Sequence, residues 1–125
     1  MIRKVFAIFL FALLFTGFSA CKKATTDPYC PEWTFYIPNG FEPNGDGIND
    51  TFSPKGTGII NFEMWIYDQN GSQIFHTTSL NMPWDGTVQG GSITICPEGV
   101  YTYLIKATDS CSYNHTYTGA VTLLK

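Results

Sequence analysis

The stretch FEPNGDGIND, residues 41–50, places amide and carboxylate side chains around two glycines in a chain of 125 residues. Asn44, Asp46 and Asp50 supply oxygen atoms at nearly the spacing of a Ca²⁺ loop of the EF-hand type. That loop also requires a glutamate at its twelfth position, where this chain has Ser53. The alternative is that Asn44 and Asp46 hydrogen-bond their own backbone while the glycines take positive φ in consecutive turns. The three residues are therefore either a partial Ca²⁺ site or turn residues.

The remaining polar residues form no pattern that is typical of an enzyme. The only imidazoles are those of His76 and His115, and the chain has no Cys-x-x-Cys, so a zinc site has few possible ligands. Carboxylates are scattered, and no nucleophile stands in a catalytic context. We therefore expect a protein without enzymatic activity, whose one candidate cofactor is Ca²⁺ at the loop described above.

The N-terminus predicts export. Two cations, Arg3 and Lys4, precede an almost unbroken apolar run over residues 5–18. At about 1.5 Å per residue this run reaches about 21 Å as a helix, which is short of the roughly 30 Å of a bilayer core. Residues 1–20 are therefore predicted to be a cleaved signal peptide rather than a membrane span.

The predicted cleavage site lies directly before Cys21. The residues FSAC, 18–21, resemble a bacterial lipobox, in which the cysteine is acylated and becomes the first residue. We predict lipidation of Cys21, a lipid anchor in the membrane, and a tether over residues 21–31; a plain signal peptide and an uncleaved anchor are the alternatives. Without the leader, five Lys and Arg face ten Asp and Glu, a net charge of −5 that disfavours nucleic acid as a partner.

Three cysteines remain if Cys21 carries lipid: Cys30, Cys96 and Cys111. An exported protein meets an oxidising compartment, so one disulfide and one leftover thiol are expected. Three pairings are possible. The pairing of Cys30 with Cys111 is favoured if the strand expected over residues 33–38 runs parallel to the last strand, because both cysteines then fall near the same end.

The rest of the chain is predicted to form β-strands, which must position the candidate residues described above. Residues 62–67 and 73–77 flank an Asn-Gly turn and predict a hairpin, and residues 99–107 and 113–124 predict a second hairpin across a turn at 109–110. Outside the leader, no apolar residues recur at helical spacing over three turns. The sequence predicts an all-β domain over residues 32–125, an Ig-like antiparallel β-sandwich of about seven strands.

Four ordered blocks of the chain resemble one family. They are IPNGFEPNGDGINDTF at residues 37–52, the hairpin at 64–75, WDG at 84–86 and PEGVYTY at 97–103. Together they resemble the gliding motility-associated C-terminal domain, the type B sorting domain of the type IX secretion system in Bacteroidota. The motif residues carried over are Pro38, Asn39, Pro43, Asn44, Gly45, Asp46, Gly47, Asn49, Asp50, Trp84, Asp85, Gly86, Gly99 and Tyr101.

The resemblance implies an Ig-like sandwich that is recognised by the export machinery, with a SprF/PorP-like outer-membrane barrel protein as partner. It departs from the family in the hairpin turn, where DQNG at residues 68–71 replaces the usual Asn-Arg-Trp-Gly. Almost nothing precedes the domain, so we expect an outer-membrane lipoprotein of the cell envelope, in protein export, surface attachment or gliding-associated assembly. Its position on the surface or on the periplasmic face is open.

Some motif residues have simpler structural explanations. Trp84 and Asp85 are expected to form a turn in which the indole packs on the sandwich and the carboxylate caps backbone amides. Tyr101 and its neighbour Tyr103 are expected to pack on one face of a strand. The alternative function is a small surface module that binds glycan or Ca²⁺, with Trp33, Tyr36 and Trp65 as exposed aromatic residues.

Overall fold

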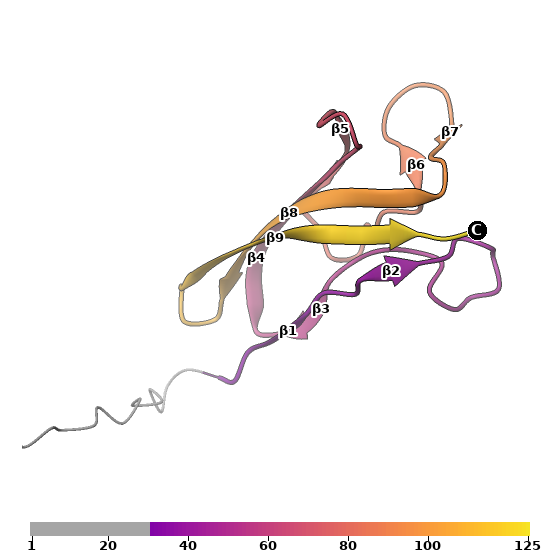
Figure 1. Cartoon of the computed structure of the whole chain (residues 1–125). Helices are drawn as coiled ribbons and strands as arrows, with labels where there is room; N and C mark the ends of the chain where they lie inside the picture. The colour runs from indigo at the N-terminus through magenta and orange to yellow at the C-terminus, as the bar shows by residue number, and fades with distance from the viewer. Residues whose placement is uncertain (1–30) are drawn as a thin grey trace, which may run out of the picture.

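A computed structural model describes residues 31–125 as an all-β domain with an Ig-like sandwich arrangement (Figure 1). The predicted signal peptide, Cys21, most of the tether and Cys30 lie outside these described residues. Among the described residues, no helix is long and apolar enough to cross a membrane. Residues 31–125 contain nine strands instead of the roughly seven that were predicted, because several are only two or three residues long. They are β1 Thr34–Tyr36, β2 Gly40–Phe41, β3 Lys55–Thr57, β4 Ile59–Tyr67, β5 Gln73–Thr77, β6 Thr87–Val88, β7 Thr94–Ile95, β8 Gly99–Asp109 and β9 Asn114–Leu123.

The main layer is a five-stranded sheet with the order β2-β9-β8-β4-β5. The two predicted hairpins, β4–β5 and β8–β9, form most of it and are confirmed. At the β4–β5 turn, Asp68 Oδ1 accepts hydrogen bonds from the amides of Asn70 (2.9 Å) and Ser72 (2.8 Å). These strands form because β-branched and aromatic residues alternate with polar ones, which suits a sheet with one buried face.

The second layer begins with the two-stranded sheet β1–β3. The pairing of Cys30 with Cys111 was favoured on the condition that a strand over residues 33–38 runs parallel to the last strand. The parallel hydrogen-bonded neighbour of β9 is β2, and β1 pairs antiparallel with β3. Instead, β1 lies over the face of β9, where Trp33 stacks on His115 and Phe35 stacks on Tyr117. Pro38 stands between β1 and β2 and has no amide hydrogen, so the chain changes from one sheet to the other there.

The core lies between the layers and is built from alternate residues of the long strands. In β4 and β8 the side chains of Met64, Ile66 and Ile105 are fully buried. Phe41 of the short strand β2, together with Phe52 and Trp84, which lie outside the nine strands, completes the core. The long strands therefore provide a flat apolar face, and the irregular segments cover it.

Candidate recognition site at the signature end

Trp84 is the residue around which distant parts of the chain meet. Its backbone exchanges two hydrogen bonds with Phe52, at 2.8 and 2.9 Å, although no regular strand is present there. Its fully buried indole contacts the rings of Phe41 and Tyr101, each with ring centroids 5.1 Å apart. The indole N–H donates to the Thr87 carbonyl at 2.8 Å, so the one polar atom of the ring is satisfied.

The residues after Trp84 form the predicted turn. Asp85 Oδ1 accepts hydrogen bonds from the amide and the hydroxyl of Thr87, at 3.0 and 2.6 Å. Gly86 has φ of 85°, a conformation that favours glycine, and a Cβ at this position would also lie close to Leu123 Cδ1, at 3.0 Å. The structure thus agrees with a turn in which the indole packs and the carboxylate caps.

The loop at residues 42–50 is organised by Asp50. Its two carboxylate oxygens accept hydrogen bonds from the amides of Gly45 and Gly47, both at 2.7 Å. Asn44 Oδ1 accepts from the Asp46 amide at 2.9 Å, and Asp46 Oδ1 accepts from the Ile48 amide at 2.8 Å. The expected hydrogen bonding of Asn44 and Asp46 to nearby backbone is therefore present, and both glycines have the expected positive φ.

The same contacts bear on the predicted Ca²⁺ ligands Asn44, Asp46 and Asp50. Both oxygens of Asp50 are directed at N–H donors, and the Asn44 amide group donates to Asp46 Oδ2 at 3.1 Å. Among residues 31–125 no group of three or more His, Cys, Asp or Glu side chains is arranged to hold a metal ion. Both carboxylate oxygens of Asp50 are therefore already used by the backbone of the loop, and the Ca²⁺ site stays a prediction.

The end of the last strand is bound to β2, the strand that directly precedes this loop. The Thr122 amide donates to the Asn39 carbonyl and the Leu124 amide donates to the Phe41 carbonyl, both at 2.9 Å. Figure 1 shows the β2–β3 loop and the C-terminus at the same end of the sandwich. We call the region formed by residues 38–52, 84–86 and 121–125 the signature end. Its exposed apolar side chains include Ile48 and Leu124, which are 69% and 44% exposed.

The motif residues therefore divide into two classes. Trp84 and Tyr101 are buried, and the Tyr101 hydroxyl donates to the Pro97 carbonyl at 2.7 Å. By contrast, the loop residues 44–49 are exposed to solvent. Burial explains why the first class is needed for the fold, whereas the loop presents a fixed shape without covering the core. Sequence order gave no indication that Trp84 would contact Phe41 and Phe52, which flank this loop.

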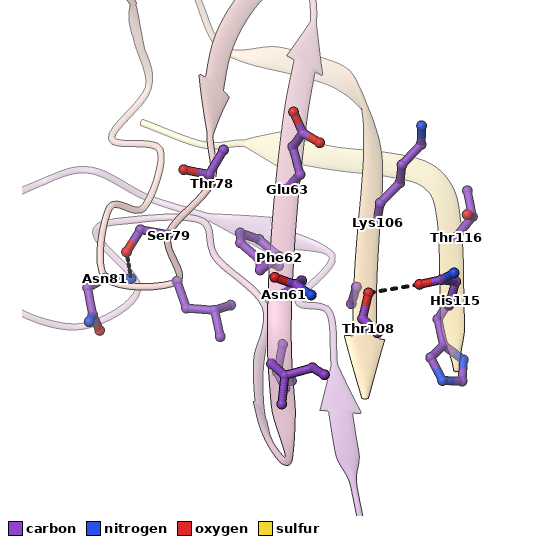
Figure 2. A pocket seen from close by; sticks show the side chains of 15 residues that line it. Asn61, Phe62, Glu63, Thr78, Ser79, Asn81, Lys106, Thr108, His115 and Thr116 are labelled. Carbon is purple, nitrogen blue, oxygen red and sulfur yellow. Dashed lines mark hydrogen bonds between the residues drawn. The ribbon is translucent and has the colours of Figure 1, made fainter. Parts of the chain in front are cut away.

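A separate groove of about 770 Å³ lies away from the signature end, where β4, β8 and β9 meet the loop 78–81. Figure 2 shows Asn61 and Glu63 on β4, Lys106 and Thr108 on β8, and Thr116 on β9 around it. The groove contains one carboxylate and one ammonium group among amides and hydroxyls. It therefore has no concentrated charge of either sign that would select an ion.

The aromatic residues predicted for glycan binding are mostly engaged within the protein. Trp65 stacks on His76 of β5 with centroids 5.2 Å apart, and Lys106 Nζ of β8 lies 5.4 Å from the Trp65 ring. These two side chains come from the strands on either side of β4. Trp33 is stacked on His115 at 4.0 Å, which leaves Tyr36, at 65% exposure, as the open member of the set.

The sequence did not reveal the network around Asp109. This buried carboxylate accepts hydrogen bonds from the amides of Cys111 (2.8 Å) and Tyr113 (3.0 Å). Its other oxygen is 2.8 Å from His115 Nε2. The hydrogen bond from His115 lowers the pKa of Asp109, helped by the two backbone amides and opposed by burial. The only local signal was an aspartate at the start of a turn.

The described cysteines differ in state. Cys96 is a free, buried thiol, and burial raises its pKa. Cys111 is disulfide-bonded. Because Cys30 lies outside the described residues, the Cys30–Cys111 bond stays a prediction.

Comparison with known families gives one result that covers most of the domain. The model of the CHU_C type IX secretion signal domain matches residues 35–123, from β1 to the end of β9. No curated protein matches the chain. The match agrees with the resemblance of the four sequence blocks and connects the protein with type IX secretion. The chain belongs to the family of CHU_C type IX secretion signal domains.

Proposed function

We propose that this protein is a non-enzymatic lipoprotein of the outer membrane whose domain is bound by a SprF/PorP-like barrel protein through the signature end. The membership in a type IX secretion signal family supports a role in this system and a place in the cell envelope. We choose the signature end as the binding surface because the motif residues divide into a buried set around Trp84 and an exposed loop held by Asp50.

A fixed loop is suited to recognition for an energetic reason. Binding costs less conformational entropy when the contact residues are already held in one shape. The hydrogen bonds that Asp50 and Asp46 accept from backbone amides fix the loop, and 69% of the Ile48 surface is exposed. An exposed apolar side chain on a rigid loop is the kind of group that fills a pocket on a partner and dominates an interface.

The test is a pull-down from outer membranes with the tagged full-length chain. Ile48→Ser should reduce recovery of the barrel protein about tenfold, since loss of one central apolar anchor costs more than 1 kcal/mol. Ile60→Ser is the matched control, because Ile60 is 55% exposed and lies at the start of β4, away from the signature end. Equal recovery with both variants, or no barrel with the unchanged protein, would contradict the proposal.

The lipoprotein part of the proposal has its own test. Mass spectrometry of the intact protein from membranes should give residues 21–125 plus acyl chains on Cys21. An unacylated protein recovered from the medium would contradict it. Protease digestion of intact cells then separates a surface position from a periplasmic one.

A further inference from the structure

The two edge strands of the main sheet differ in how their outward backbone groups are used. At the β5 edge, Gln89 occupies the place of a neighbouring strand. Its side-chain Oε1 accepts a hydrogen bond from the His76 amide at 2.8 Å, and its own amide donates to the Ile74 carbonyl at 2.8 Å. The β5 edge is therefore closed at its centre, which is a common protection against pairing with another chain.

The β9 edge is open over most of its length. β2 pairs only with Thr122 and Leu123 at the end of β9. Among residues 31–125, no strand pairs with Asn114–Ala120 on the side away from β8. Trp33 and Phe35 of the second layer cover the face of this segment and not its edge, as their ring stacking shows. The space beside β9 in the plane of the sheet is thus not taken by β1.

The existing hydrogen bonds define which groups point out of this edge. The Thr122 amide donates to Asn39 on the open side of β9. Backbone groups alternate sides along an antiparallel strand, and the β8–β9 register continues without a shift from Thr122 back to Asn114. The N–H and C=O groups of Thr116, Thr118 and Ala120 therefore face the same open side.

The segment has none of the features that usually prevent strand pairing. Residues 114–120, NHTYTGA, include no Lys, Arg, Asp, Glu or Pro, and the register shows no bulge. Threonine and tyrosine also favour strands. A regular, uncharged edge of this kind is a template for one more strand.

We propose that this edge pairs with the same edge of a second copy of the protein, antiparallel and with the two-fold axis at Tyr117. The outward backbone N–H and C=O groups of this segment belong to its even-numbered residues. The proposed register places Thr116 opposite Thr118 of the other copy and Asn114 opposite Ala120, so that each of these outward groups forms a hydrogen bond. The main sheets of the two copies then form one continuous sheet.

A second copy fits this edge better than an unrelated segment for two reasons. The edge carries no charge, so no like charges meet across the axis, and the cross-strand Thr116–Thr118 pairs are favourable. Both strands are also already ordered by pairing with their own β8, so neither has to lose the conformational entropy that an unfolded peptide would lose. This inference is independent of the proposed barrel partner, because it concerns a different surface.

The first test compares Thr118→Pro with Thr118→Val in the full-length chain, by sedimentation equilibrium in density-matched detergent. Both variants lose the hydroxyl, but only proline removes the outward N–H, which makes no bond within the monomer strand pair. We expect a protein mass of twice that of one chain for the unchanged protein and for Thr118→Val, and the mass of a single chain for Thr118→Pro. A monomeric unchanged chain, or a dimeric proline variant, would overturn the proposal.

The second test remains informative if the proline variant does not fold. Thr116→Cys and Thr118→Cys chains are mixed and oxidised mildly, and a non-reducing gel is run. The proposed register places these two positions about 5.5 Å apart between Cα atoms, within reach of a disulfide. A cross-linked dimer in the mixture, and none with either variant alone, is expected. Absence of the cross-link, or its formation by one variant alone, would overturn the register and the proposal.

Discussion

Two aspartates stabilise turns at opposite ends of the sandwich with similar hydrogen bonds in different surroundings (Figure 1). Asp50 accepts from two backbone amides at 2.7 Å, and Asp109 accepts from two at 2.8 and 3.0 Å. The bonds of Asp50 stay within an exposed loop. Asp109 is 4% exposed and also binds His115, which stacks on Trp33 of the second layer.

Asp50 only shapes a loop, whereas Asp109 belongs to a set of contacts that links two layers of the sandwich. At the signature end, the aromatic contacts of Trp84 join the segments around residues 52 and 84 to the main sheet, and Asp50 holds only its own loop. At the other end, which we call the hairpin end and which comprises residues 109–113 with Trp33 and His115, Asp109 holds His115, and the ring of His115 stacks on Trp33 of the second layer. Removing equivalent hydrogen bonds at the two ends should therefore lower the stability of the folded protein by unequal amounts.

The largest effect is expected from Trp84→Ala. This change removes a fully buried side chain and its contacts with Phe41 and Tyr101, and it should lower the free energy of unfolding by about 3–5 kcal/mol. Trp33→Ala at the hairpin end removes a partly exposed ring and should cost about 1–2 kcal/mol. Urea denaturation measures both. Equal losses would show that the signature end does not depend on its aromatic core.

The next largest difference is expected between Asp109→Ala and Asp50→Ala. Asp109→Ala leaves the buried amides of the turn without an acceptor and frees His115, so the loss in Tm should be more than about twice that of Asp50→Ala. Water can replace Asp50 at the exposed loop amides. Thermal denaturation followed by circular dichroism measures the two Tm values, and a larger loss for Asp50→Ala would reverse the comparison.

Local sequence patterns predicted the parts of the fold that depend on nearby residues. The hairpins β4–β5 and β8–β9 follow from alternation and turn composition, and the hydrogen bonds of Asn44 and Asp46 follow from their own side-chain chemistry. The four motif blocks also identified the family correctly.

The parts that were not predicted depend on contacts between distant residues. Nothing near Trp33 or His115 indicates that they stack, because one precedes the first strand and the other lies in the last. The predicted strand over residues 33–38 ends early as β1, and the chain then enters the other sheet as β2, a change that Pro38 permits but does not determine. Strands of two residues, such as β6, are also too short to produce an alternating pattern.

The stability of the protein should also depend on pH through Asp109. The pKa of Asp109 is lowered in the folded protein, so its ionised form contributes stability that is fully present above the unfolded value of about 3.9. That stability is lost as the pH falls through the folded pKa. The urea concentration at the unfolding midpoint of the unchanged protein should therefore decrease as the pH is lowered from about 4. The midpoint of Asp109→Asn should decrease less steeply over the same pH range. Identical acid profiles would show that another carboxyl group is responsible.

The smallest effect is expected from Ca²⁺ or EDTA, because both oxygens of Asp50 already accept backbone hydrogen bonds. A site with Kd tenfold below the Ca²⁺ concentration would add about 1.4 kcal/mol, which is about 6 °C in Tm for a domain of this size. We expect a change of less than about 1 °C. Asp46→Asn is the control, since it removes a charge and keeps an acceptor for the Ile48 amide. A rise of several degrees with Ca²⁺ that Asp46→Asn abolishes would instead establish the ion site, and the loop would then resemble Asp109 in joining charge to stability.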